Sequence, residues 1–142
     1  MKCFTMKEIT IGQKAYFTKQ ITEGDVFVFG GATGDLNPVH INEEYAKNTR
    51  FGTRIAHGLI SASLIGAALG SELPGEGSVY VSQELKFKAP VYLGDTITAE
   101  LEVVSKEVER NRLTLKTTCR NQDGIVVIEG IAVTMPAKEK RV

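Results

Sequence analysis

An acid and an imidazole lie five residues apart in the short stretch GATGDLNPVH, which spans residues 31–40. Asp35 and His40 are separated there by the Asn37-Pro38 step, and proline both lacks an N–H donor and keeps the preceding residue out of helical geometry. We therefore expect a fixed, non-helical turn that directs both side chains toward one pocket. Together they could hold a water molecule, one group taking its proton while the other donates a proton elsewhere. The alternative is ordinary turn chemistry, in which Asp35 bonds only to backbone amides.

A second candidate feature is the His57-Gly58 pair, which opens a long apolar segment. At a helix N-terminus, the Gly58 N–H has no partner within the helix, the dipole favours an anion, and the missing side chain lets an oxygen atom approach. Gly58 is therefore a candidate donor to a developing oxyanion, and the alternative is that it only permits tight packing. We interpret His57 as a packing or capping residue and not as a second catalytic base. Two histidines and two scattered cysteines lack the spacing of a zinc site, so no metal is expected.

The longer segments indicate a curved antiparallel sheet with one long helix. Residues 57–73 predict a helix that is buried nearly all round, because no charge precedes Glu72. Residues 13–21 predict a first strand. Further β-rich segments follow, and turn residues divide the last three; the segments are 78–93, 95–109, 112–120 and 125–135. The simplest assembly is an α+β fold in which about five strands wrap around the long helix.

Two shorter helices are predicted on either side of the Asp35–His40 segment. Thr22, followed three residues later by Asp25, resembles an N-cap with an acidic first turn, and favours a helix that ends near Gly30 or Gly31. Asn42 is a good N-cap for the sequence EEYAKN, whose glutamates lie at the positive end of the helix dipole.

Length and charge restrict the class of protein. The 142 residues fit a single domain with a core over about residues 12–135, and Lys plus Arg and Asp plus Glu both total 17. This balance argues against nucleic acid or an anionic membrane as a partner. The longest apolar run, residues 55–70, is shorter than the ~20 residues that span a bilayer. Cys3 and Cys119 lie far apart without a signal peptide, so we expect free thiols in a soluble, cytoplasmic protein.

The stretch FGGATGDLNPVHINEEYA, with its Gly-Asp-x-Asn-Pro-x-His core, resembles the hydratase motif of the MaoC-like, (R)-specific enoyl-CoA hydratases. The resemblance continues through RIAHGLISASLIGAALGSELPGEGSVYVSQELKFKAPVYLGDTITAELEV and covers most of residues 12–135. In that family the fold is the hot dog, a curved antiparallel sheet around a long helix. This fold agrees with the assembly that the periodicity predicts.

Carried over to this chain, the resemblance implies a reversible addition of water to a trans-2-enoyl-CoA, which gives an (R)-3-hydroxyacyl-CoA. Asp35 is the expected base and His40 the partner that orients the water and returns the proton, although coupled groups can share these roles. The family uses the glycine after the histidine of HG as an oxyanion donor, which matches Gly58. Asn37 is a weaker candidate for a substrate contact, because its expected role is to shape the turn. No cofactor is implied, since coenzyme A enters only as part of the substrate.

Three further residues are candidate substrate contacts. Some family members carry a serine one turn beyond Ser63, where this chain has Gly66, so Ser63 is the candidate replacement. Lys86 and Lys88 flank Phe87 and point to the opposite face, where they could meet the phosphates of a pantetheine carrier. A solvated outer face is the alternative explanation of both lysines.

The resemblance also implies a homodimer, or a higher oligomer of dimers, in which the second subunit helps to shape the acyl tunnel. Exposed sheet edges favour such an assembly. Two other functions remain open. A hot-dog thioesterase would direct water to the thioester carbonyl and release coenzyme A, and a non-catalytic acyl-thioester binding module would need neither Asp35 nor His40. The intact motif favours the hydratase over both alternatives.

Overall fold

The computed structural model describes residues 1–140. Its centre is a five-stranded antiparallel sheet, as the sequence predicted, and the strand order is β1-β3-β4-β5-β2. The five strands are β1 (Lys14–Gln20), β2 (Val79–Phe87), β3 (Thr96–Glu107), β4 (Arg112–Arg120) and β5 (Val126–Met135). Strands β1 and β2 form the two edges of the sheet. The predicted strand at 78–93 ends early at Phe87, before Pro90, which cannot supply a ladder N–H.

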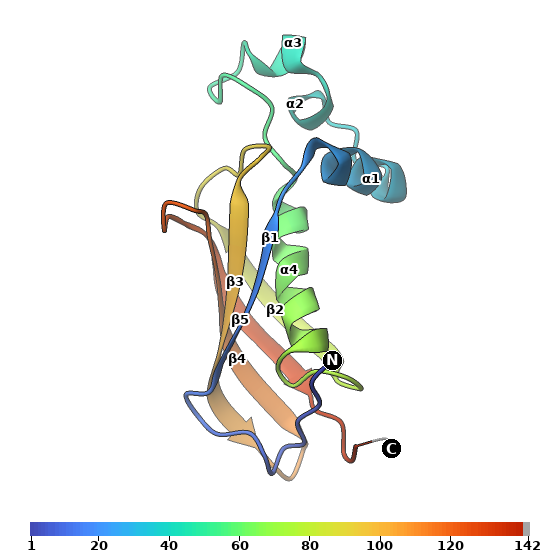
Figure 1. The fold of residues 1–142 in the computed structure, drawn as a ribbon, viewed down its shortest axis with the longest axis vertical. Coiled ribbons are helices and arrows are strands. Elements are labelled where there is room, and N and C mark those ends of the chain that lie inside the picture. The colour runs from blue at the N-terminus through green and yellow to red at the C-terminus, as the bar shows by residue number, and fades with distance from the viewer. Residues whose placement is uncertain (141–142) are drawn as a thin grey trace.

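The long helix α4 (Gly58–Ser71) runs along one face of the curved sheet (Figure 1). Alternating apolar residues of the strands form the inner face; Leu101 of β3 and Leu113 and Leu115 of β4 are fully buried. They belong to one core cluster with Ile65 of α4. Burial of such side chains contributes about 1.5–3 kcal/mol each, so this layer holds the helix against the sheet.

One side of α4 is exposed to solvent in the single chain, so the prediction that α4 is buried nearly all round is wrong for the single chain. Ile60, Leu64 and Ile65 face the sheet and are buried, whereas Leu59 is 54% exposed and Ser63 is also exposed. The sheet covers only the side of the helix that it faces, and β2 lies at its edge. Although α4 is strongly apolar, no helix within the described residues is long and apolar enough to span a membrane.

Three short helices lie together at one end of the sheet (Figure 1). They are α1 (Glu23–Thr33), α2 (Pro38–Ile41) and α3 (Glu43–Ala46). Thr22 and Asp25 form the predicted capping box of α1, and Asn42 caps α3 by accepting a hydrogen bond from Tyr45 N–H. Helix α1 passes the predicted end near Gly30 and stops at Gly34, whose left-handed conformation (φ 81°) terminates it.

Arg54 ties two of these helices to the segment that leads into α4. Its guanidinium is paired with Glu23 in the first turn of α1 at 2.5 Å and with Glu43 in the first turn of α3 at 3.3 Å. The Arg54 side chain is only 15% exposed. The three helices are therefore held as one group above the N-terminus of α4, and the Asp35–His40 segment lies within that group.

Candidate active site

The Asp35–His40 segment is a turn followed by one helical turn. Asp35 lies between the end of α1 and the beginning of α2, and Asn37 is the N-cap of α2 with non-helical backbone angles. Its side chain accepts a hydrogen bond from Val39 N–H at 3.2 Å. The expectation of a wholly non-helical segment is wrong, because Pro38 begins a helix that carries His40. Proline is well tolerated at this first position, where no N–H is needed.

His40 is held in one tautomer by the backbone. Its Nδ1 lies 2.7 Å from the carbonyl oxygen of Ile55, and a carbonyl can only accept, so Nδ1 carries the hydrogen. The free Nε2 then has a lone pair whenever the ring is neutral. Burial is the main cause that lowers the pKa of His40 below its usual value, and the nearby His57 lowers it further. The hydrogen bond to Ile55 and the charge of Asp35 raise the pKa and so oppose this shift. His40 is therefore suited to accept a proton near neutral pH.

His57 joins the two predicted residues in the structure. Its Nε2–H donates to the main-chain carbonyl of Asp35 at 2.9 Å, and the same nitrogen lies 4.0 Å from Asp35 Oδ2. Its ring lies against that of His40, with centroids 4.0 Å apart. His57 is 2% exposed, as expected of a packing residue, but its side chain makes no capping bond. The sequence alone did not place it beside the pair.

Gly58 begins α4 directly beneath an aromatic ring. A methyl group at Gly58 would lie 2.6 Å from Cε1 and 2.7 Å from Cδ1 of Phe87, so only glycine fits without displacing the ring. Within residues 1–140, no hydrogen-bond partner is found for the Gly58 N–H. This donor is thus available to a ligand, as the helix position predicted. Phe87 was not a predicted site residue.

These residues enclose a cavity of about 190 Å³, called here the catalytic cavity, whose full lining is Asp35, His40, His57, Gly58, Leu59 and Phe87. An adjoining side cavity of about 300 Å³ shares His40, Gly58 and Phe87 with it. Asp35, His40 and Gly58, which carry a carboxylate, an imidazole and an unbonded backbone N–H, therefore line one small volume. Such a set can bind a water molecule, transfer its proton and stabilise a developing negative charge.

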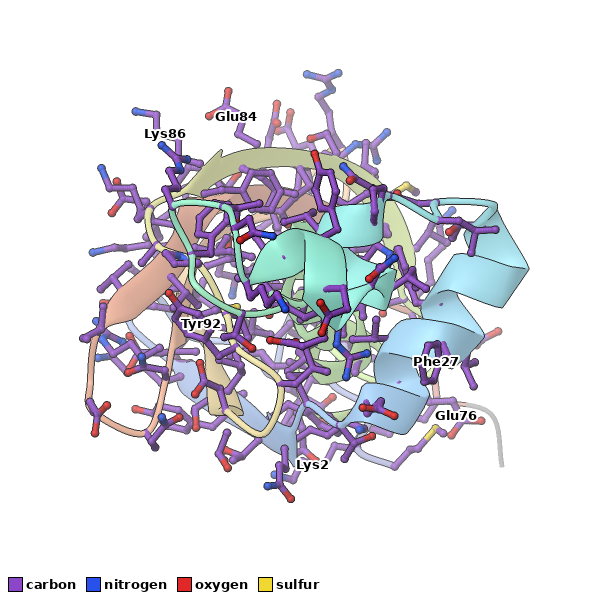
Figure 2. The ribbon with its side chains drawn as sticks, turned by 90° about the horizontal axis from the view of Figure 1, so that it is seen from above. Lys2, Phe27, Glu76, Glu84, Lys86 and Tyr92 are labelled. Carbon is purple, nitrogen blue, oxygen red and sulfur yellow. The ribbon has the colours of Figure 1, made fainter. Side chains whose placement is uncertain are left out.

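Two predicted substrate contacts lie at cavities, and two lie apart from them. Lys88 lines the side cavity and is 3.6 Å from Glu129. Ser63 lines a wider edge cavity of about 620 Å³ between α4 and β2, and its hydroxyl donates to Leu59 O at 2.7 Å. Lys86 points outward from β2, away from the body of the protein (Figure 2). Asn37 lines none of these cavities and acts on the backbone of α2.

The catalytic cavity is not preorganised for a metal ion. Asp35, His40 and His57 each offer an atom within 4.8 Å of the others. Tetrahedral zinc with bonds near 2.0–2.1 Å needs ligand atoms about 3.4 Å apart, whereas His57 Nε2 and Asp35 Oδ2 are 4.0 Å apart. In addition, His57 Nε2 already donates to the Asp35 carbonyl. The geometry fits proton transfer better than metal binding.

Known proteins share sequence similarity with most of this chain. Residues 7–123 match the family model described as MaoC like domain. An (R)-specific enoyl-CoA hydratase of Rhodospirillum rubrum is 50% identical over 133 residues, 93% of this chain and 92% of the relative. A 3-hydroxybutyryl-CoA dehydratase of Methylorubrum extorquens is 42% identical, over 99% of this chain and 89% of the relative.

A solved structure extends the similarity to the fold. The R-hydratase PhaJ1 from Pseudomonas aeruginosa, in its unliganded form, superposes with a TM-score of 0.92 at 43% identity, over 96% of this chain and 88% of that chain. The predicted hot-dog fold is confirmed, with the sheet curved around α4 and the short helices placed over the start of α4. The chain belongs to the MaoC-like family of hot-dog proteins.

Proposed function

We propose that this protein catalyses the reversible hydration of a trans-2-enoyl-CoA to an (R)-3-hydroxyacyl-CoA. The observation that carries this proposal is the convergence of Asp35, the unprotonated Nε2 of His40 and the free N–H of Gly58 on one cavity. The relatives named as an (R)-specific enoyl-CoA hydratase and a 3-hydroxybutyryl-CoA dehydratase support the same reaction class in both directions.

In the proposed reaction, Asp35 and His40 hold one water molecule between them. As the water oxygen bonds to the β-carbon, Asp35 takes one proton, while His40 Nε2 orients the water by accepting a hydrogen bond from the O–H that remains as the product hydroxyl. The electron pair of the double bond moves through the α-carbon to the thioester oxygen, where the Gly58 N–H stabilises the negative charge. The pair then returns the proton to the α-carbon on the same face, so both groups end as they began. This cycle uses acid–base groups of the chain and requires no cofactor.

Lys88 is the lysine that we propose for contact with the carrier. It lines a cavity that also reaches His40 and Gly58, so a thioester held at the catalytic cavity could extend toward it. Arg50 lines the same cavity and is not ion-paired among the described residues, so it offers a phosphate a second cation beside Lys88, which is itself paired with Glu129. Lys86 points outward and is assigned to the solvated face. Ser63 is proposed as an acyl-side contact at the edge cavity.

We also propose a homodimer that covers the open side of α4. Leu59 on α4 is 54% exposed, and Val81 on the edge strand β2 is 45% exposed, although both line the edge cavity. An edge strand beside an exposed apolar surface favours pairing with a second copy. Sedimentation equilibrium should show a dimer, and Val81→Lys should shift the equilibrium toward monomer. A monomeric wild type would contradict the proposed dimer.

We also propose a cytoplasmic location for this protein. The free thiols of Cys3 and Cys119, which lie far apart in the sequence, support it.

The reaction is tested with crotonyl-CoA by two parallel assays. Loss of the ultraviolet absorbance of the conjugated thioester reports hydration, and a thiol-trapping reagent reports release of coenzyme A. We expect absorbance loss without thiol release, an (R)-alcohol as product, and a fall of ~10²–10⁴-fold in Asp35→Asn and in His40→Ala. Asp123→Asn, in the turn between β4 and β5, is the matched control and should keep full activity. Thiol release would indicate a thioesterase, and unchanged rates in both site variants would refute the assignment.

A further inference from the structure

His57 makes more specific contacts than a core residue of a helix start requires. Its Nε2–H donates to the main-chain carbonyl of Asp35, and its ring lies 4.0 Å from the ring of His40. On the remaining side, its ring is 4.7 Å from that of Phe29 in α1. A single side chain from the beginning of α4 thus contacts both members of the proposed acid–base pair and the helix that precedes them.

The contacts of His57 compensate for the exposure of Asp35. The Asp35 side chain is 50% exposed and lies in a connection between two helices. Among residues 1–140, only the Asn37 N–H donates a hydrogen bond to its carboxylate, at 3.3 Å. Loop side chains of this kind usually sample several positions. His57 is 2% exposed, and its bond to the Asp35 carbonyl joins this connection to the buried end of α4.

Burial of His57 also has an energetic cost that packing alone does not explain. Its Nδ1 is buried without a hydrogen-bond partner among the described residues. An apolar ring at this position would avoid the cost of an unpaired buried nitrogen. Such a ring would lose the bond to Asp35.

The geometry points to His57 as a positioning residue that fixes the Asp35 main chain through Nε2–H and supports the His40 ring by face contact. This inference rests on the proposed hydratase function. His57 is not assigned a proton in the reaction: it acts through Asp35 and His40, by keeping the carboxylate and the imidazole at the distance that one water molecule can bridge. Misplacement of reacting groups by about 1 Å can cost ~10²-fold in rate.

Two substitutions separate the hydrogen bond of His57 from its ring contact. His57→Phe keeps an aromatic ring but loses the donor, whereas His57→Gln places an amide donor near the position of Nε2 but loses the ring. If the bond to Asp35 is the main restraint, His57→Phe should lose ~10²-fold in kcat with little change in KM, and His57→Gln should recover part of that loss. Both variants are assayed for hydration of crotonyl-CoA.

The pH profile gives a readout that a purely structural role would not move. The titratable groups that face His40 are Asp35 and His57, and the cations Arg50 and Lys88 line the adjoining side cavity. Since His57 helps to lower the pKa of His40, the acid limb of kcat/KM should move to higher pH in both variants.

Thr134→Val is the matched control for the loss of a buried side-chain donor. The Thr134 hydroxyl donates to the Val79 carbonyl at 2.8 Å, away from the catalytic cavity. This variant should lower thermal stability while leaving kcat and the acid limb unchanged.

The outcomes separate this inference from the proposed function. If the wild type does not hydrate crotonyl-CoA or longer enoyl-CoA substrates, the proposed function fails first. If the wild type is active and folded His57→Phe has the same kcat and acid limb, the positioning role is refuted. A loss in Thr134→Val equal to that in His57→Phe would also overturn it, because general destabilisation would then account for the effect.

Discussion

Replacement of Gly58 by alanine adds one methyl group at the most crowded point of the catalytic cavity. The new carbon would lie 2.6 and 2.7 Å from two ring atoms of Phe87. Carbon atoms prefer separations of about 3.5–4.0 Å, so the ring must withdraw by about 1 Å. Phe87 is 55% exposed and has room to move outward. The clash should therefore be relieved by displacement of Phe87 and not by unfolding.

The expected effect of Gly58→Ala is a loss of activity without a loss of stability. Alanine is favoured over glycine within helices by ~0.5–1 kcal/mol, which offsets part of the strain from the displaced ring. The backbone N–H remains, but the methyl group occupies the approach of the thioester oxygen, and the wall formed by Phe87 has moved. We expect kcat/KM to fall by ~10²-fold, the scale of losing one oxyanion donor, while the melting temperature stays close to that of the wild type.

The assay compares hydration rates of Gly58→Ala with those of the wild type and three further variants. Gly70→Ala is the matched control, because a methyl group there, near the other end of α4, meets no atom within 4 Å. In Gly58→Ala/Phe87→Ala the clash is absent. If displacement of the ring causes the loss of activity, the double variant should have the same rate as Phe87→Ala alone. If the methyl group blocks the thioester oxygen, the double variant should remain slower than Phe87→Ala. Wild-type activity in Gly58→Ala would refute the assignment of this N–H and its approach.

Three other perturbations test separate parts of the site. Burial lowers the pKa of His40 below the ordinary value of 6.5, and the proposed reaction uses the neutral form of His40. The value of kcat/KM should therefore persist as the pH falls through 6.5 and decline only at lower pH. A decline centred above pH 6.5 would contradict this prediction. Lys88→Ala should raise KM about fivefold (~1 kcal/mol) for crotonyl-CoA but not for crotonyl-pantetheine, which lacks the phosphates, and Lys86→Ala should change neither. Arg54→Met should lower the free energy of unfolding by about 1 kcal/mol in denaturant titrations, because both of its partner carboxylates are about half exposed to solvent. Salt screens such pairs, so the loss should be smaller at high salt.

Local patterns in the sequence predicted the elements that surround the site. Thr22 and Asn42 marked the beginnings of α1 and α3, and Leu113 and Leu115, which alternate with Thr114 and Lys116 in the sequence, lie on the inner face of β4. The family resemblance singled out Asp35, His40 and Gly58, and the structure brings these three together at one cavity. Their roles in the reaction remain predictions, as do those of Asn37 and Ser63.

Predictions from local sequence patterns were wrong or incomplete for three features: the Asn37-Pro38 step, the burial of α4 and the two lysines Lys86 and Lys88. The Asn37-Pro38 step was expected to exclude helix, yet proline at the first helical position begins α2 and Asn37 caps it. The composition of α4 predicted burial on all sides, but a single sheet covers only one side of a helix. Lys86 and Lys88 appeared equivalent in sequence, although only Lys88, just beyond the end of β2, lines a cavity that reaches the site.

The sequence by itself determined the beginnings of the helices, the faces of the strands and the residue types available for proton transfer. These features depend on interactions between residues a few positions apart, such as caps, proline geometry and two-residue alternation. Only the tertiary structure decided that His57 supports His40 and Asp35, and that Phe87 closes over Gly58. These contacts join segments distant in the chain, because they arise when the sheet curves around α4 and carries its edge strand to the helix N-terminus.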